Sequence, residues 1–165
     1  MVTVDNLPRK KTAVERRPVK ATAGQTAATS QGGITTLSEE NYARYAPLVR
    51  LVQSTDTKQL AATYFRFYPL FQLTYDDLGY PGEYFNDRLV AVIDHLLETP
   101  DVRGPVKLVQ PKVFFEYADP SLEARSAGQK LLIRMGSTNA TQIKAKLREL
   151  KNEVTTGRDP APRSP

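Results

Sequence analysis

The feature that most constrains this chain is the spacing of apolar residues near its C-terminal end. They recur every three or four positions, which is the period of an α-helix that buries one face. The stripe consists of Ala140, Ile143, Leu147, Leu150 and Val154. Basic side chains fall between these residues, and we expect them to cover the outer face: Lys144, Lys146, Arg148 and Lys151. The pattern predicts a long amphipathic helix that begins at Ser137 or Thr138.

Two earlier stretches have the same period and carry their own start and stop signals. The first begins at Ser38, whose hydroxyl suits a helix cap, and Pro47 inside it predicts a kink or a break with a restart. The second begins after Asp56, contains Pro69, which we expect to kink it, and ends at Gly79.

Two more helices follow from the same signals. One spans roughly residues 83–98 and buries the stripe that includes Leu89 and Ile93. The other begins at Asp119-Pro120, a cap followed by proline, and ends at Gly136 with Gly128 in its middle. Between them, residues 106–109 and 113–117 are β-branched or aromatic, which indicates a short extended pair or hairpin.

These elements predict a mainly α fold, a compact bundle of about five helices with one short extended pair. We expect a single helical domain over residues 38–155, within the 165 residues of the chain. Residues 1–37 are interpreted as a basic arm and flexible linker, because residues 21–36 are small and polar and bury little. Residues 156–165 hold three of the prolines and are interpreted as a disordered tail.

The charge and composition exclude several kinds of site. The chain has no Cys and a single His, so thiol catalysis, zinc ribbons and iron–sulfur sites are excluded. It contains no phosphate-binding loop and no dinucleotide fingerprint, and we expect no cofactor and no metal. No apolar run is long enough to span a bilayer, and residues 1–5 do not begin a signal peptide.

Most of the formal charge of +5 lies in residues 1–25, which hold six basic and two acidic side chains. Such an arm can attract nucleic acid or anionic lipid, or simply keep the chain soluble. It has no aromatic residue for stacking on bases, and residues 42–155 are nearly balanced with 15 basic and 13 acidic side chains. We therefore expect no specific nucleic-acid binding.

Aromatic residues gather in one part of the chain, since 11 of the 14 lie between Tyr42 and Phe85. Successive positions on a helix point about 100° apart, so the four aromatic residues in 64–68 cannot all face one core. They either pack against neighbouring helices or form a partner-binding surface. The candidate aromatic surface consists of Tyr64, Phe65, Tyr68, Tyr80 and Tyr84.

Polar residues beside apolar elements form a second candidate site. Asp87 and Asp94 are seven apart and share a helix face, and a carboxylate near His95 could build an acid–base pair with a partner from elsewhere in the fold. Structural pairing and solvated charges are the competing interpretation. The candidate polar cluster consists of Asn86, Asp87, Arg88, Asp94, His95, Gln110, Lys112, Gln129 and Lys130, with no catalytic residue assigned.

Several long motifs resemble an uncharacterised bacterial family. Among them are Arg66-Phe67-Tyr68-Pro69-Leu70-Phe71, Tyr84-Phe85-Asn86-Asp87-Arg88-Leu89-Val90, Leu108-Val109-Gln110-Pro111-Lys112-Val113 and Ser126-Ala127-Gly128-Gln129-Lys130. The resemblance covers roughly residues 2–152, to a domain of unknown function found in membrane-anchored envelope proteins of proteobacteria. It brings no known activity, substrate or catalytic residue.

The resemblance implies a domain tethered to the inner membrane and facing the periplasm. The chain lacks the membrane helix and spacer that the family carries upstream, and Val4 would already lie inside the domain. We therefore expect a shortened form of the family protein, with Val2, Val4 and Leu7 as the remnant of an upstream helix. Without signal and anchor, the cytoplasm is the alternative location.

Three functions remain open at this point. The first is a non-enzymatic, envelope-associated domain that binds a protein partner in the cell envelope. Its interface would be the region from Tyr64 to Tyr84, with Asn86, Asp87, Arg88 and Lys112 as a polar rim. The second is an enzyme on an envelope substrate with an Asp/His acid–base site. The third is a binder of nucleic acid or anionic lipid through the basic arm. The sequence does not indicate an oligomeric state.

Overall fold

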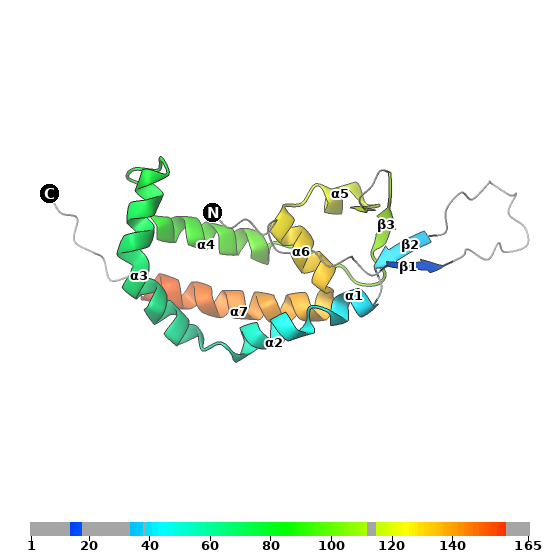
Figure 1. Ribbon diagram of the computed structural model, residues 1–165, viewed down its shortest axis with the longest axis horizontal. Coiled ribbons are helices and arrows are strands. Elements are labelled where there is room, and N and C mark those ends of the chain that lie inside the picture. The colour runs from blue at the N-terminus through cyan, green and yellow to red at the C-terminus, as the bar shows by residue number, and fades with distance from the viewer. Residues whose placement is uncertain (1–13, 18–33, 38, 112–114, 158–165) are drawn as a thin grey trace, which may run out of the picture. The chain divides into compact units, whose positions relative to one another are not determined.

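The computed structural model describes residues 14–17, 34–37, 39–111 and 115–157 (Figure 1). Most of these residues are helical, and the rest include one small antiparallel sheet. The helices are α1 (Glu39–Ala43), α2 (Ala46–Ser54), α3 (Thr57–Asp77), α4 (Phe85–Leu97), α5 (Pro120–Glu123), α6 (Ala127–Met135) and α7 (Ser137–Thr156). The strands are β1 (Val14–Arg17), β2 (Ile34–Leu37), β3 (Lys107–Val109) and β4 (Glu116–Tyr117). The mainly α class with a short extended pair is therefore confirmed.

Contacts divide the chain into two compact units. Unit 1 comprises Met1–Pro47 and Pro100–Ala140, and unit 2 comprises Leu48–Thr99 and Thr141–Pro165. One boundary falls inside α2, one between Thr99 and Pro100, and one inside α7, and each unit consists of two separate pieces of sequence. The expectation of one helical domain over residues 38–155 stays a prediction.

The sheet of unit 1 has four antiparallel strands in the order β1-β2-β3-β4. The predicted extended pair is confirmed as β3 and β4, with Leu108 opposite Tyr117 and Val109 opposite Glu116. Strand β2 lies between β1 and β3, and Thr35 is opposite Leu108. Residues 112–114, which include Lys112, lie outside the described part of the chain.

Two strands form inside the segment that the sequence predicts to be a linker. Strands β1 and β2 both fall within residues 1–37, so that interpretation is wrong for residues 14–17 and 34–37. The partners of β2 include β3, some 70 residues further along the chain. Pairing of this kind depends on a distant segment, and local composition does not reveal it. The other residues of the predicted arm, with Val2, Val4 and Leu7, lie outside the described residues, as does Ser38.

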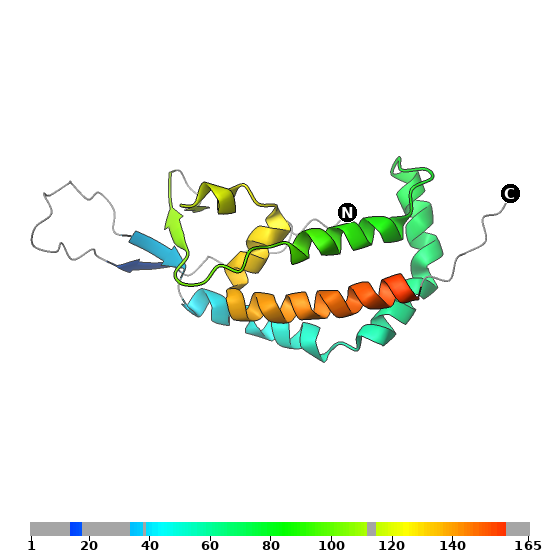
Figure 2. The ribbon, with the colours of Figure 1, turned by 180° about the vertical axis from the view of Figure 1, so that it is seen from behind.

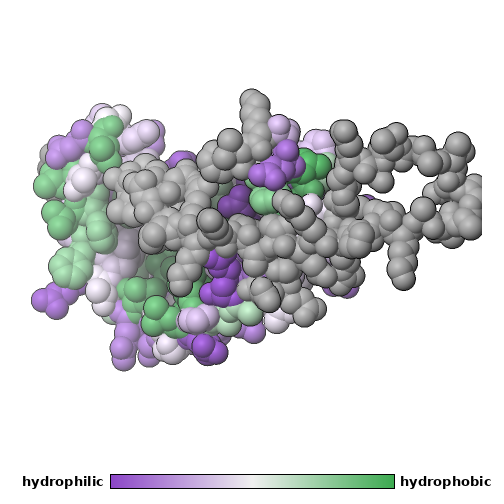
Figure 3. All heavy atoms as spheres, turned by 45° about the vertical axis from the view of Figure 1, so that its right-hand side comes forward, coloured by the Kyte–Doolittle hydropathy of each residue, from purple (hydrophilic) through white to green (hydrophobic). Residues whose placement is uncertain are grey.

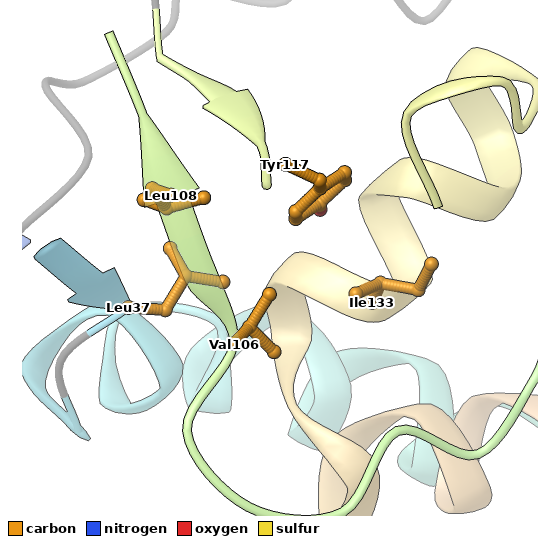
Figure 4. Close-up of a cluster of buried hydrophobic side chains, with 5 residues drawn as sticks. All are labelled: Leu37, Val106, Leu108, Tyr117 and Ile133. Carbon is orange, nitrogen blue, oxygen red and sulfur yellow. The ribbon is translucent and has the colours of Figure 1, made fainter. Parts of the chain in front are cut away.

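The core of unit 1 forms where the sheet packs against α6. Figure 4 shows side chains from both elements pointing toward one another. The buried residues are Leu37, Val106, Leu108, Tyr117 and Ile133, and Tyr42, Val102, Phe115 and Leu122 pack around them. The burial of these side chains supplies the apolar free energy that a lone hairpin lacks in water.

A hydrogen-bonded carboxylate ties β4 to α6. Glu123 Oε2 accepts from the backbone N–H of Tyr117 at 2.8 Å, and its other oxygen pairs with Lys130. Burial alone would raise the pKa of Glu123, but the bonds from Lys130 and from the Tyr117 N–H outweigh it and lower the pKa. The ionised form of Glu123 therefore stabilises the contact of β4 with α6 in unit 1.

The predicted helix over residues 119–136 is two helices. α5 ends at Glu123, and α6 begins after Ser126, whose Oγ accepts from the backbone N–H of Gln129 at 3.4 Å. A serine that caps its own helix start competes with a continuous helix, so the chain breaks there. Gly128 consequently lies in the first turn of α6, and its predicted position in the middle of a helix is wrong.

Unit 2 contains most of α2, all of α3 and α4, and the C-terminal part of α7. The predicted restart near Pro47 is confirmed, since α1 and α2 are separate and the proline sits in the first turn of α2, where no N–H is needed. Asp56 caps α3 as predicted, and accepts from the backbone N–H groups of Lys58 and Gln59 at 2.9 and 3.1 Å. α3 continues through Pro69, and its axis bends along its length (Figures 1 and 2).

Three of the basic residues predicted to cover the outer face of α7 instead form hydrogen bonds or ion pairs with other elements of unit 2. Lys144 donates to the carbonyl of Thr99, and Lys151 pairs with Asp94 of α4. Lys146 donates to the carbonyl of Thr55 at 3.2 Å. Long lysine stems cover apolar surface while their heads find acceptors, so these side chains are half-buried and the predicted outer face is wrong for them.

Gly136, between α6 and α7, meets two separate constraints. Its φ of 82° and ψ of 157° lie in a region of backbone space that is essentially restricted to glycine. A Cβ at this position would also lie 2.8 Å from the ring of Tyr42. Gly104 also has positive φ, at 88°, but nothing lies within 4 Å of its Cβ position.

We expect Gly136→Ala to destabilise the chain more than Gly104→Ala. The backbone strain at Gly104 costs about 1–2 kcal/mol. Gly136→Ala adds the displacement of an aromatic ring, about 1–3 kcal/mol more. Urea unfolding of the two variants measures the difference, and equal losses would contradict the close approach of Tyr42.

Candidate interaction surface

Helix α3 has an inner face that packs within unit 2 and an outer face that is largely exposed. Ala61 and Tyr75 are buried, and Tyr64, Phe65 and Tyr68 are half-buried. The outer face is also apolar: the exposed fractions are 44% for Leu60, 48% for Phe67, 58% for Leu70, 39% for Phe71 and 60% for Leu73. We call these five residues the apolar face of α3. Hydrophobic residues gather over α3 at the left of Figure 3.

Tyr64 lies at the centre of a cluster of aromatic rings that extends from the inner side of α3 to Phe71, the least exposed residue of the apolar face. Its ring centroid is 5.3 Å from Phe65, 5.8 Å from Tyr68, 5.9 Å from Phe71 and 6.5 Å from Phe85 of α4. Burial, with Tyr68 nearby, raises the pKa of Tyr64 to about 12. The prediction that the aromatic residues of 64–68 cannot all face one core is confirmed, since Phe67 is exposed.

Asn86 joins three helices of unit 2 from a buried position in the first turn of α4. Its Oδ1 accepts from the hydroxyl of Tyr64 on α3 at 3.1 Å. Its Nδ2 donates to the carbonyl of Val154 on α7 at 3.4 Å. A buried amide is stable only when its donors and acceptors are paired, so Asn86 fixes how the three helices meet.

Gln72 of α3 performs the capping that α4 lacks at its own start. The N-cap residue of α4 is Tyr84, whose side chain makes no capping hydrogen bond to the first turn. Gln72 Oε1 instead accepts from the N–H of Phe85 at 2.9 Å and from the hydroxyl of Tyr68 at 3.0 Å. Its Nε2 donates to the carbonyl of Glu83 at 2.7 Å. This single side chain therefore satisfies orphan groups at the α3–α4 turn.

The turn itself is stacked on α3. Tyr80 lies against Tyr75 with ring centroids 4.7 Å apart and an interplanar angle of 7°. The hydroxyl of Tyr75 donates to Glu83 Oε2 at 3.3 Å. Tyr80 and Tyr84 each keep 47% of their surface exposed. The turn after Gly79 is thereby held against the last two turns of α3.

The predicted polar cluster falls in both units. Five of its residues lie on α4 in unit 2: Asn86, Asp87, Arg88, Asp94 and His95. Of these, Asn86 is buried and Asp94 pairs with Lys151, whereas Asp87, Arg88 and His95 are exposed. Gln110 is exposed after β3, Gln129 is buried in α6 and Lys130 pairs with Glu123, all in unit 1. Lys112 lies outside the described residues.

The predicted aromatic surface is split between the inner face of α3 and the turn that follows this helix. Tyr64, Phe65 and Tyr68 belong to the inner face, and Tyr80 and Tyr84 expose part of their rings at the turn. Sequence reasoning did not single out Leu70 and Leu73, which are the most exposed residues of the apolar face of α3. Helical periodicity could have identified them, because a helical projection places both leucines away from Ala61 and Tyr75, which are buried.

None of the described helices is long and apolar enough to cross a membrane. Over the same residues, no group of three or more His, Asp or Glu side chains is placed to hold a metal ion.

The comparison with family models matches residues 1–151 to a protein family described only as of unknown function, DUF3014. The chain belongs to this family. The DUF3014 match spans both units. No curated protein and no solved structure matches the chain.

We expect Asn86→Ala to lower the free energy of unfolding by about 2 kcal/mol, because it leaves the Tyr64 hydroxyl and the Val154 carbonyl without their partner. Arg88→Ala, at an exposed position of the same helix, is the matched control, with an effect within about 0.5 kcal/mol. Chemical unfolding followed by circular dichroism measures both. Losses of the same size would contradict the structural role of Asn86.

Proposed function

We propose that the chain is a non-enzymatic interaction domain of the bacterial cell envelope that binds a protein partner through the apolar face of α3. The observation that supports it is the exposure of five large apolar side chains on one helix. Water-exposed apolar residues gathered on one face, instead of scattered singly, are typical of interaction sites. The family resemblance supports the envelope location.

The surroundings of this face favour binding. The inner face of α3 is held by Asn86 and Gln72, so the outer residues are presented on a fixed support. A rigid support reduces the conformational entropy that a partner must remove on binding. Tyr80 and Tyr84 at the adjoining turn add partly exposed rings, a residue type enriched in interfaces.

We expect a photo-crosslinking amino acid at Phe67 to form a covalent protein adduct in living bacterial cells. The same amino acid at Lys58, an exposed position on another side of α3, is the control and should form none. Gel electrophoresis of the envelope and soluble fractions measures the adduct. Equal adducts at both positions, or none at either, would contradict the proposed surface, and an adduct found only in the soluble fraction would contradict the envelope location.

A further inference from the structure

Four exposed residues of α3 form one stripe with a symmetrical order. Arg66, Leu70, Leu73 and Asp77 are spaced four, three and four apart, so they lie on the same side of the helix. Leu70 and Leu73 are 58% and 60% exposed, and Arg66 and Asp77 are exposed as well. We call these four residues the self-complementary stripe. Its two ends carry opposite charges, and its middle is apolar.

The stripe has the same spacing of charged and apolar positions in both directions along the helix. Its midpoint lies between Leu70 and Leu73. A rotation by 180° about an axis through this midpoint, perpendicular to the helix, exchanges the two leucines and exchanges Arg66 with Asp77. A two-fold symmetric interface needs a surface of this kind, because the same patch must complement itself. In a second copy lying antiparallel, each Arg66 would face the partner's Asp77, and the leucines would meet in between.

We propose that the chain forms a symmetric dimer in which the α3 helices of two copies pack antiparallel along the self-complementary stripe. This inference rests on the proposed function and names the partner as a second copy of the chain.

The two end charges of the stripe favour the same orientation. Arg66 lies near the middle of α3, and Asp77 is its last residue. An antiparallel pair brings opposite charges together and also opposes the two helix dipoles. A parallel pair would place like charges side by side, which is unfavourable at both ends.

Phe67 extends the contact beside the stripe. Phe67 lies beside the stripe, and the Arg66 guanidinium carbon is 5.9 Å from the centroid of its ring. The Phe67 ring can thus be covered by the partner while Arg66 remains beside it. A pair centred between Leu70 and Leu73 overlaps only over residues 66–77 of α3 and buries less than the roughly 1,600 Å² of a standard interface, so we expect weak, concentration-dependent association.

Charge reversal on the stripe tests the arrangement. Arg66→Glu gives a copy with only acidic stripe ends, and Asp77→Lys gives one with only basic ends. Each variant alone should dimerise about tenfold more weakly, because both symmetric pairs become repulsive. Mixed one to one, the two variants should associate again, because both pairs are then attractive. Sedimentation velocity from about 5 to about 500 μM measures all three samples and the unchanged chain.

Two further variants make the test specific. Leu73→Ser should abolish the dimer, and Lys58→Glu, which changes a charge off the stripe, should leave it unchanged. Circular dichroism should show the same helix content in all of them, because the altered side chains are exposed.

The proposal is overturned if the unchanged chain stays monomeric over this range. It is overturned also if the dimer ignores the charge reversals, or if the mixed variants fail to associate. A monomeric chain whose Phe67 nevertheless crosslinks to another protein in cells would refute the dimer and leave the proposed function standing. If that crosslink is absent too, both fail.

Discussion

The arrangement of unit 2 depends on one buried amide. Asn86 receives the Tyr64 hydroxyl from α3 and donates to the last turns of α7, so three helices meet at one polar side chain. Apolar packing alone tolerates several helix rotations, but a buried amide is satisfied by few of them. Gln72 adds a second such constraint at the α3–α4 turn. The two amides decide which face of α3 is inward.

The exposed face of α3 is determined by which of its faces packs inward. α3 carries apolar residues around most of its circumference, and its polar partners Asn86, Gln72 and Glu83 all act on the side of Tyr64, Tyr68 and Tyr75. Leu70 and Leu73 are consequently left in water. A helix that satisfies its hydroxyl and amide groups internally and leaves leucines outside is arranged for association, because burying those leucines against a partner is favourable.

The positions of most helices could be predicted from the sequence, but most contacts between them could not. The ends of α3 were predictable because Asp56 and Gly79 act on the residues next to them in the sequence, as a helix cap and as a helix stop. The break at Ser126 was missed, because a serine is compatible both with a helix start and with a helix interior. The β2–β3 pairing joins distant segments. Asn86 was found as a candidate residue, but its buried position follows only from Tyr64 and Val154.

The most direct test of this account is the distance between two spin labels in the dimer, one on each copy. The chain has no cysteine, so Lys58→Cys creates a single labelling position at the start of α3. In an antiparallel pair centred between Leu70 and Leu73, a rise of 1.5 Å per residue places the two labels about 40 Å apart. Double electron–electron resonance should therefore show a distance near this value in concentrated samples. A parallel pair would bring the labels to within about 15 Å of each other, and that result would contradict the account.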